Sequence, residues 1–137
     1  MASLKTVVIA CAAFMTVGVA FGAGPMPEAG EIAVSVNQTV MIELVTQTDG
    51  TLKAVILKTV SGERPHVLFR LTRDGTMRML EVENHYGRTL KYAARMCMKK
   101  RDLCAETSVV PVRAGLSAFE SWGDPIDLLV LSQFTFE

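Results

Sequence analysis

The chain has 137 residues, half of them hydrophobic and one-fifth charged, so its composition is that of a folded protein and excludes a disordered one. Fourteen lysines and arginines balance fourteen aspartates and glutamates, which argues against a nucleic-acid partner, because such a partner needs an excess of positive charge. The length suits one domain and leaves no room for a barrel-type enzyme.

Residues 1–22 have the pattern of a secretory signal peptide. Lys5 is the only charged side chain before Glu28, and an apolar run follows from Val7 to Phe21, interrupted only by Thr16 and Gly18. Ala20 and Gly22 then have the small-residue spacing of a cleavage site. The apolar run is shorter than the roughly 20 residues that span a membrane. We therefore expect cleavage after Gly22, no transmembrane anchor in the mature chain, and a periplasmic or secreted protein; an uncleaved anchor is the alternative.

Behind the signal, residues 23–30 form a flexible leader with two prolines, and residues 31–137 are expected to form a single folded domain. Apolar and polar residues alternate along most of this domain, at the period-two spacing of β-strands. Turn signals such as Asp49 followed by Gly50 separate the alternating segments. The predicted strands are residues 32–36, 39–46, 52–60, 67–71, 76–83, 88–99, 106–113 and 126–136.

Two of these strands, and one segment between them, carry a specific expectation. Residues 88–99 alternate like a strand although alanine, methionine, leucine and lysine also favour helices, and we predict a strand because the neighbouring segments are strands. Ser117 and Glu120 have the spacing of a capping box and predict one helical turn. In the last strand, one face is expected to carry Ile126, Leu128, Val130, Phe134 and Phe136.

About eight short strands and no long helix predict an all-β fold, a small antiparallel β-sandwich. The resemblance to immunoglobulin-like domains is one of architecture only, because the order of cysteine, tryptophan and cysteine in true immunoglobulin domains is absent. No internal repeat is visible.

Two cysteines remain once Cys11 is removed with the signal, and an oxidising compartment favours their pairing. Cys97 and Cys104 flank a polar segment that can turn the chain, so we predict a disulfide across a hairpin. Closing a loop of about eight residues stabilises a fold by roughly 2–3 kcal/mol. A reactive thiol or a metal pair is the alternative, but the spacing is not Cys-x-x-Cys and no histidine is near.

The methionines provide one sharper hypothesis. Met77, Met79, Met96 and Met98 would share one face if residues 76–83 and 88–98 formed a hairpin, and His85 could join them from the turn. Thioether clusters suit Cu(I), so a periplasmic copper-binding protein is an alternative function. Methionine is also a routine core residue, and we expect core packing and no cofactor.

No catalytic motif is recognisable. The nucleophile-elbow sequence Gly-x-Ser-x-Gly is absent, and both histidines, His66 and His85, fall in expected loops. A small hydrolase remains the second alternative, whereas the favoured interpretation is that the chain is not an enzyme.

A binding surface is predicted at residues 119–125, where Phe119 and Trp122 have the aromatic character of interface anchors. Lys91, Arg95 and Lys99 share the second face of their strand and could meet an acidic partner. The competing interpretations are that Trp122 plugs the end of the sandwich and that the basic ridge is a solvated edge. The sequence thus predicts an exported binding or structural module, an adaptor or inhibitor of another envelope protein.

Overall fold

The protein is described here from a computed structural model that covers residues 27–59, 64–98, 100, 103–123 and 125–137. The predicted signal peptide and the first residues of the leader, up to residue 26, lie outside the described residues. The described part consists mainly of antiparallel strands, as predicted. These strands are β2 (Ile32–Ser35), β3 (Gln38–Thr46), β4 (Leu52–Leu57), β5 (Val67–Asp74), β6 (Met77–Asn84), β7 (Leu90–Met98), β8 (Leu103–Thr107), β9 (Ser117–Trp122) and β10 (Leu128–Phe136).

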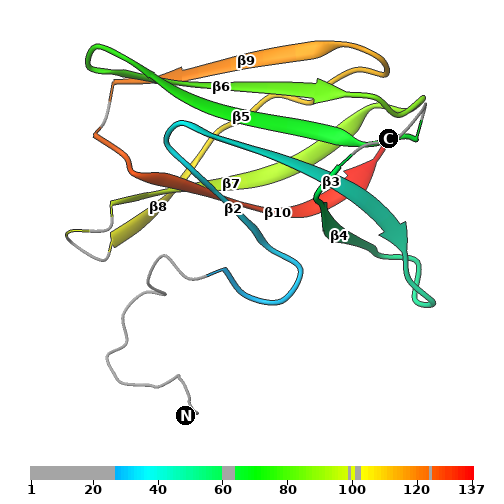
Figure 1. Ribbon diagram of the computed structural model, residues 1–137. Coiled ribbons are helices and arrows are strands. Elements are labelled where there is room, and N and C mark those ends of the chain that lie inside the picture. The colour runs from blue at the N-terminus through cyan, green and yellow to red at the C-terminus, as the bar shows by residue number, and fades with distance from the viewer. Residues whose placement is uncertain (1–26, 60–63, 99, 101–102, 124) are drawn as a thin grey trace, which may run out of the picture.

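The strands form two sheets that face each other as a sandwich (Figure 1). One sheet has the order β4-β3-β5-β6-β9, and the other has the order β2-β10-β7-β8. Alternate residues of each sheet point into the space between them; Phe69 of β5, Leu80 of β6 and Leu131 of β10 are fully buried there. Each such side chain contributes about 1.5–3 kcal/mol through burial. The prediction of a small antiparallel β-sandwich is confirmed.

The segment with both strand and helix character is strand β7, as predicted. It pairs with β10 along one edge and with β8 along the other. Leu90 and Ala94 are buried in the core, and Lys91 lies on the exposed side. Pairing on both edges satisfies the backbone of β7 within the sheet, and this outweighs the modest helix propensity of its residues.

The expected hairpin between residues 76–83 and 88–98 is wrong. β6 pairs with β5 and β9, whereas β7 belongs to the other sheet. The connection after Asn84 therefore crosses from one layer to the other. Two alternating segments joined by a short turn can form a hairpin or can belong to different sheets. Here the pairing of β6 with β5 and β9, and of β7 with β8 and β10, determines which arrangement forms.

Two further local expectations are corrected. Residues 117–120 are part of strand β9 and form no helical turn, because pairing with β6 outcompetes the capping-box signal. The strand expected over residues 106–113 corresponds to β8, which ends at Thr107. Beyond it only Val112 forms an isolated bridge, with Leu90. Pro111, which lacks an N–H group, sits where the ladder is interrupted.

The first four residues of β10 are buried on both faces of the sheet, and a bulge separates them from the rest of the strand. Leu129 and Leu131 face the core, while Leu128 and Val130 form a small apolar cluster with Cys97 on the other face. The pairing with β7 shifts between Ser132 and Thr135, and this shift returns the next aromatic residue, Phe134, to the core side. The predicted common face for residues 126–136 is therefore wrong, because the bulge changes the alternation midway.

Candidate functional site

An open groove of about 940 Å³ lies between the C-terminal half of β10 and the β3–β4 hairpin. These two segments lie close together at the right of Figure 1, near the end of β10. The groove is lined by backbone and side chains from both sheets and from the start of β2: residues 29–31, 44, 46, 50–52, 86, 88 and 132–136. It is therefore an opening at one edge of the sandwich.

The groove exists because β2 is too short to cover its neighbour. β2 pairs with residues Leu128–Leu131 of β10 and with none beyond them among the described residues. Before Ile32 the chain turns away, with Glu31 N–H donating to the Glu28 carbonyl at 2.9 Å and Gly30 at a φ of 86°. That φ lies in the left-handed region, which glycine adopts without steric cost. The rest of β10 is left beside open space.

The uncovered part of β10 has backbone groups that can pair with another strand. Glu137 N–H donates to the Thr89 carbonyl at 2.9 Å, on the β7 side. Because backbone groups of successive residues point to opposite edges, Phe136 presents its N–H and C=O away from β7. Gln133, within the bulge, has a φ of 56°, which is uncommon for a residue with a side chain. Bulges of this kind are frequent next to binding sites.

The floor of the groove is apolar and aromatic. Phe134 and Leu44 are buried, and the rings of Tyr86 and Phe136 lie 4.9 Å apart. The Tyr86 hydroxyl accepts a hydrogen bond of 2.8 Å from Leu44 N–H, beyond the last residue at which β3 pairs with β5. Burial raises the pKa of the Tyr86 phenol, and the hydrogen bond from Leu44 lowers it in part. Tyr86 therefore remains a neutral acceptor that joins the floor to β3.

Asn84 positions the loop that carries Tyr86 and Arg88 into the groove. Its side-chain oxygen accepts from Tyr86 N–H at 2.9 Å, and its side-chain nitrogen donates to the Arg88 carbonyl at 2.8 Å and to the Val112 carbonyl at 2.9 Å. The Asn84 side chain is buried, which makes each of these bonds costly to lose. It ties the crossing between the two sheets to the loop before β9.

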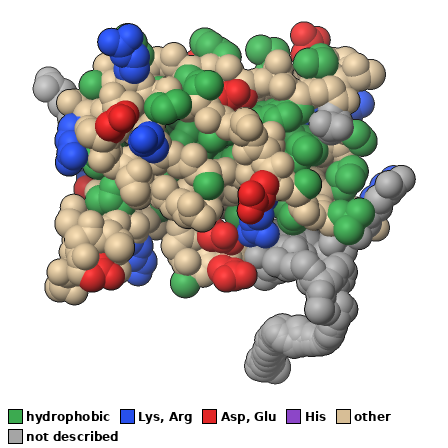
Figure 2. Space-filling model, turned by 180° about the vertical axis from the view of Figure 1, so that it is seen from behind, with side chains coloured by type: hydrophobic (Ala, Val, Ile, Leu, Met, Phe, Trp, Pro, Cys, Tyr) green, Lys and Arg blue, Asp and Glu red, His purple; other side chains and the backbone are tan. Residues whose placement is uncertain are grey.

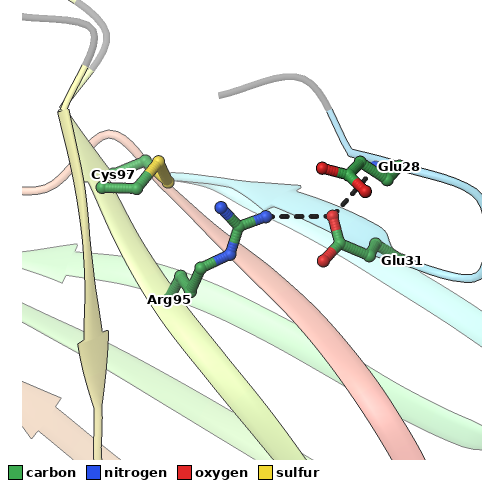
Figure 3. Close-up of a disulfide and its surroundings, with 5 residues drawn as sticks. Glu28, Glu31, Arg95 and Cys97 are labelled. Carbon is green, nitrogen blue, oxygen red and sulfur yellow. Dashed lines mark hydrogen bonds and ion pairs between the residues drawn. A yellow bond between two sulfur atoms is a disulfide. The ribbon is translucent and has the colours of Figure 1, made fainter. Parts of the chain in front are cut away.

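Charged groups stand at opposite ends of the groove. Glu31, at the β2 end, accepts from Glu28 N–H and forms an ion pair with Arg95, each at 2.9 Å. Figure 3 shows that the Arg95 guanidinium reaches from β7 across β10 to meet it. Arg88, at the other end, lies over the Phe136 ring, 5.3 Å from its centre. The groove thus offers main-chain pairing, an aromatic floor and one charged residue at each end.

The predicted disulfide is present between Cys97 and Cys104, which lie directly opposite each other on β7 and β8. Their Cα atoms are 4.1 Å apart. The bond lies on the outer face of the four-stranded sheet, beside Arg95 (Figure 3). The sequence identified this pair correctly because only two cysteines follow the predicted signal peptide.

The predicted basic ridge is divided among separate ion pairs. Arg95 contacts Glu31 as described above, and Lys91 lies 3.7 Å from Glu137. Lys99 lies outside the described residues. Figure 2 likewise shows positive and negative side chains interspersed on the face seen from behind, with hydrophobic side chains gathered mainly toward its right side.

The two predicted aromatic anchors have different positions. Phe119 is 62% exposed on β9, on the outer face of its sheet. Trp122 is only 9% exposed, and its indole N–H donates to the Thr107 hydroxyl at 2.7 Å. That bond joins the edge strands of the two sheets. Trp122 therefore closes the sandwich at this edge, which was the competing interpretation, and little of its indole is left for a partner.

The methionines of the copper hypothesis are not brought together. Met77 and Met79 lie on the outer face of the five-stranded sheet, because Leu80 and Val82 take the inner positions of β6. Met96 lies on β7 and packs against the core, and Met98 has the same parity. The hairpin on which the hypothesis depends is not formed. Among the described residues, no three histidines, cysteines, aspartates or glutamates lie close enough to hold a metal ion.

The two histidines stack on each other at the surface, with ring centres 4.3 Å apart. His85 Nε2 lies 3.1 Å from a Glu83 carboxylate oxygen, and His66 Nδ1 lies 2.9 Å from the Arg64 carbonyl. Within the described part of the chain, neither imidazole forms a hydrogen bond with a serine hydroxyl. The nucleophile and base of the hydrolase hypothesis are therefore not assembled by these residues.

Sequence reasoning missed the groove. In the sequence, Tyr86 falls between two predicted strands and Arg88 begins the second of them, and nothing in the pattern indicates that they face β10. Residues 128–131 are all apolar, and this was a signal that could have indicated a strand buried on both faces. The bulge at Gln133 has no sequence signal of its own.

No helix in the described part of the chain is long and apolar enough to cross a membrane. Searches of protein-family models, curated proteins and solved structures each find no match for this chain.

Proposed function

We propose that this protein is an exported binding module of the cell envelope that takes an extended segment of a partner protein alongside β10. The segment would lie as an added strand, continuing the line of β2 over residues 132–136. The observation that carries the proposal is the uncovered edge of β10 beside an aromatic floor. Strand addition uses both features, because main-chain hydrogen bonds provide affinity and alternate side chains enter pockets.

The second edge of the groove supports the same function. β4 is the outermost strand of its sheet, and its residues Val55 and Ile56 are exposed. Proteins usually protect such edges, since an unprotected apolar edge pairs with other chains. A groove flanked by two uncovered edges is suited to an extended polypeptide and lacks the enclosed shape of a small-molecule pocket.

Export is proposed from the sequence and is consistent with the disulfide. Residues 1–22 have the pattern of a signal peptide, and disulfides persist in oxidising compartments. The partner is accordingly proposed to be another envelope protein. An adaptor or an inhibitor would both use this mode of binding.

Photo-crosslinking tests the proposal. A photoreactive amino acid at Thr135, on the groove rim, is expected to crosslink envelope proteins, and mass spectrometry should place the crosslinks in one extended segment. Leu52→Arg puts a charge on the groove lining and should abolish this crosslinking. Leu116→Arg is the matched control, because Leu116 is exposed and lies outside the groove lining; it should leave crosslinking unchanged.

Two outcomes would overturn the proposal. One is that crosslinking from Thr135 persists in Leu52→Arg, since the partner would then bind outside the groove. The other is that Leu116→Arg abolishes it while Leu52→Arg does not, which would place the contact beside β9.

A further inference from the structure

Arg88 is an unbalanced charge at one end of the groove. Its guanidinium lies over Phe136, and no carboxylate of the described residues forms an ion pair with it. The acidic residue that follows Phe136 along the chain, Glu137, lies against Lys91. A cation held against an aromatic ring and left without a counter-ion is suited to bind an anionic group of the occupant.

The charge at the opposite end of the groove is already neutralised. Glu31 is bound by Arg95 and by Glu28 N–H, and residues 29–31 belong to the groove lining there. The two ends of the groove therefore differ in charge, and this difference favours one direction of a bound strand.

The charge of Arg88 distinguishes the two directions in which a strand could lie beside β10. A strand parallel to β10 has its C-terminal end beside Phe136 and Arg88, whereas an antiparallel strand has its N-terminal end there. Arg88 repels an ammonium group and attracts a carboxylate, so the charge favours the parallel direction. Residues 132–136 span about 16 Å at roughly 3.3 Å per residue, which accommodates four or five residues.

We propose that the groove recognises the free C-terminal end of its partner, with the terminal carboxylate bound to Arg88 and alternate apolar side chains on the floor of Leu44, Leu52 and Phe136. This inference rests on the proposed function and specifies its ligand. Arg88 is suited to the role because guanidinium groups bind carboxylates through two parallel hydrogen bonds. The loop backbone that presents it is fixed by Asn84 and does not depend on the Arg88 side chain.

The test begins with a library of random octapeptides displayed with free C-termini, selected on the mature protein. The best peptide is then synthesised with a C-terminal carboxylate, with a C-terminal amide, and with an amide that follows an added aspartate. The carboxylate form is expected to bind wild type at least about tenfold more tightly than either amide. Arg88→Gln should remove this preference while retaining binding of the plain amide, and Arg88→Lys should retain part of it.

Each contrary result has a distinct meaning. Equal binding of carboxylate and plain amide, both lost in Leu52→Arg, would overturn recognition of the terminus and leave strand addition in place. Binding of the aspartate-containing amide as tightly as the carboxylate would assign Arg88 to an acidic side chain and overturn the inference as stated. Failure of the selection to yield any peptide that Leu52→Arg weakens would overturn the proposed function as well.

Discussion

Asn84 connects three loop segments through one buried side chain, and its removal tests how the groove is held. Asn84→Ala leaves the Arg88 and Val112 carbonyls and Tyr86 N–H without their partner. Because buried polar groups without partners are costly, we expect the free energy of unfolding to fall by about 3 kcal/mol. Urea unfolding followed by fluorescence of Trp122, the one tryptophan of the chain, measures this. Arg88→Ala, which keeps the backbone acceptor, serves as the control, and a similar loss in both variants would contradict the role given to Asn84.

The two tyrosines predict how stability changes at high pH. Burial raises the pKa of Tyr92, the Glu120 carboxylate raises it further, and burial also raises that of Tyr86. A phenol with a raised pKa in the folded state stabilises the fold fully below its ordinary value of about 10, and this contribution is lost as the pH rises above that value. Stability should therefore be constant near neutral pH and fall steeply above about pH 10.

Urea unfolding at a series of alkaline pH values measures this loss, and phenolate absorbance follows the ionisation itself. Tyr92→Phe should flatten most of the decline, because the hydroxyl of Tyr92 is buried without a hydrogen-bond partner among the described residues. An unchanged decline in this variant would show that other groups control the alkaline transition.

The disulfide between β7 and β8 is expected to contribute to the free energy of unfolding. Cys97 and Cys104 close a loop of about eight residues, which on the chain-entropy model corresponds to about 2.5 kcal/mol of stability. We expect reduction, or the double variant Cys97→Ala/Cys104→Ala, to lower the free energy of unfolding by this amount. Urea unfolding with and without reductant measures it. Reductant should have no further effect on the double variant, and any further loss there would show that reduction acts elsewhere.

The strands differ in how far their sequence determines them. β7 could be predicted because its alternation agrees with the pairing that it makes on both edges. β9 could not, because Ser117 and Glu120 favour a local capping arrangement and only pairing with β6 overrides it. The faces of β10 were also beyond prediction, because a bulge at one residue pair reverses the alternation for everything after it.

The same reasoning explains which parts of the candidate site were predictable. The disulfide could be predicted from the number of cysteines after the predicted signal peptide and from the oxidising compartment that this signal implies. The groove depends on where β2 ends and on which sheet receives β7, and neither is encoded by local residue patterns. Phe119 and Trp122 look alike in sequence as exposed aromatics, yet one lies on the outer face of β9 and the other closes the edge between the sheets.

At the scale of the whole molecule, the proposed export predicts a shortened chain with an oxidised cysteine pair. Expressed as the full chain in a Gram-negative bacterium, the protein should lose residues 1–22 and begin at Ala23, because its apolar segment is too short to remain as an anchor. Intact mass spectrometry of a periplasmic fraction measures both the cleavage and the oxidised cysteine pair. A full-length product in the cytoplasm with free thiols would contradict this prediction and, with it, the envelope location of the partner.

The Arg95–Glu31 ion pair has a mechanical consequence. It fastens the turn ahead of β2 to β7, an interior strand of the sheet, by passing over the strand between them. Tension applied to the chain upstream of Glu28 is therefore shared with the middle of the sheet before it peels β2 from its edge. When the chain is pulled from its N-terminal side, residues 29–31 would keep their place in the groove lining under loads that would detach a four-residue edge strand alone.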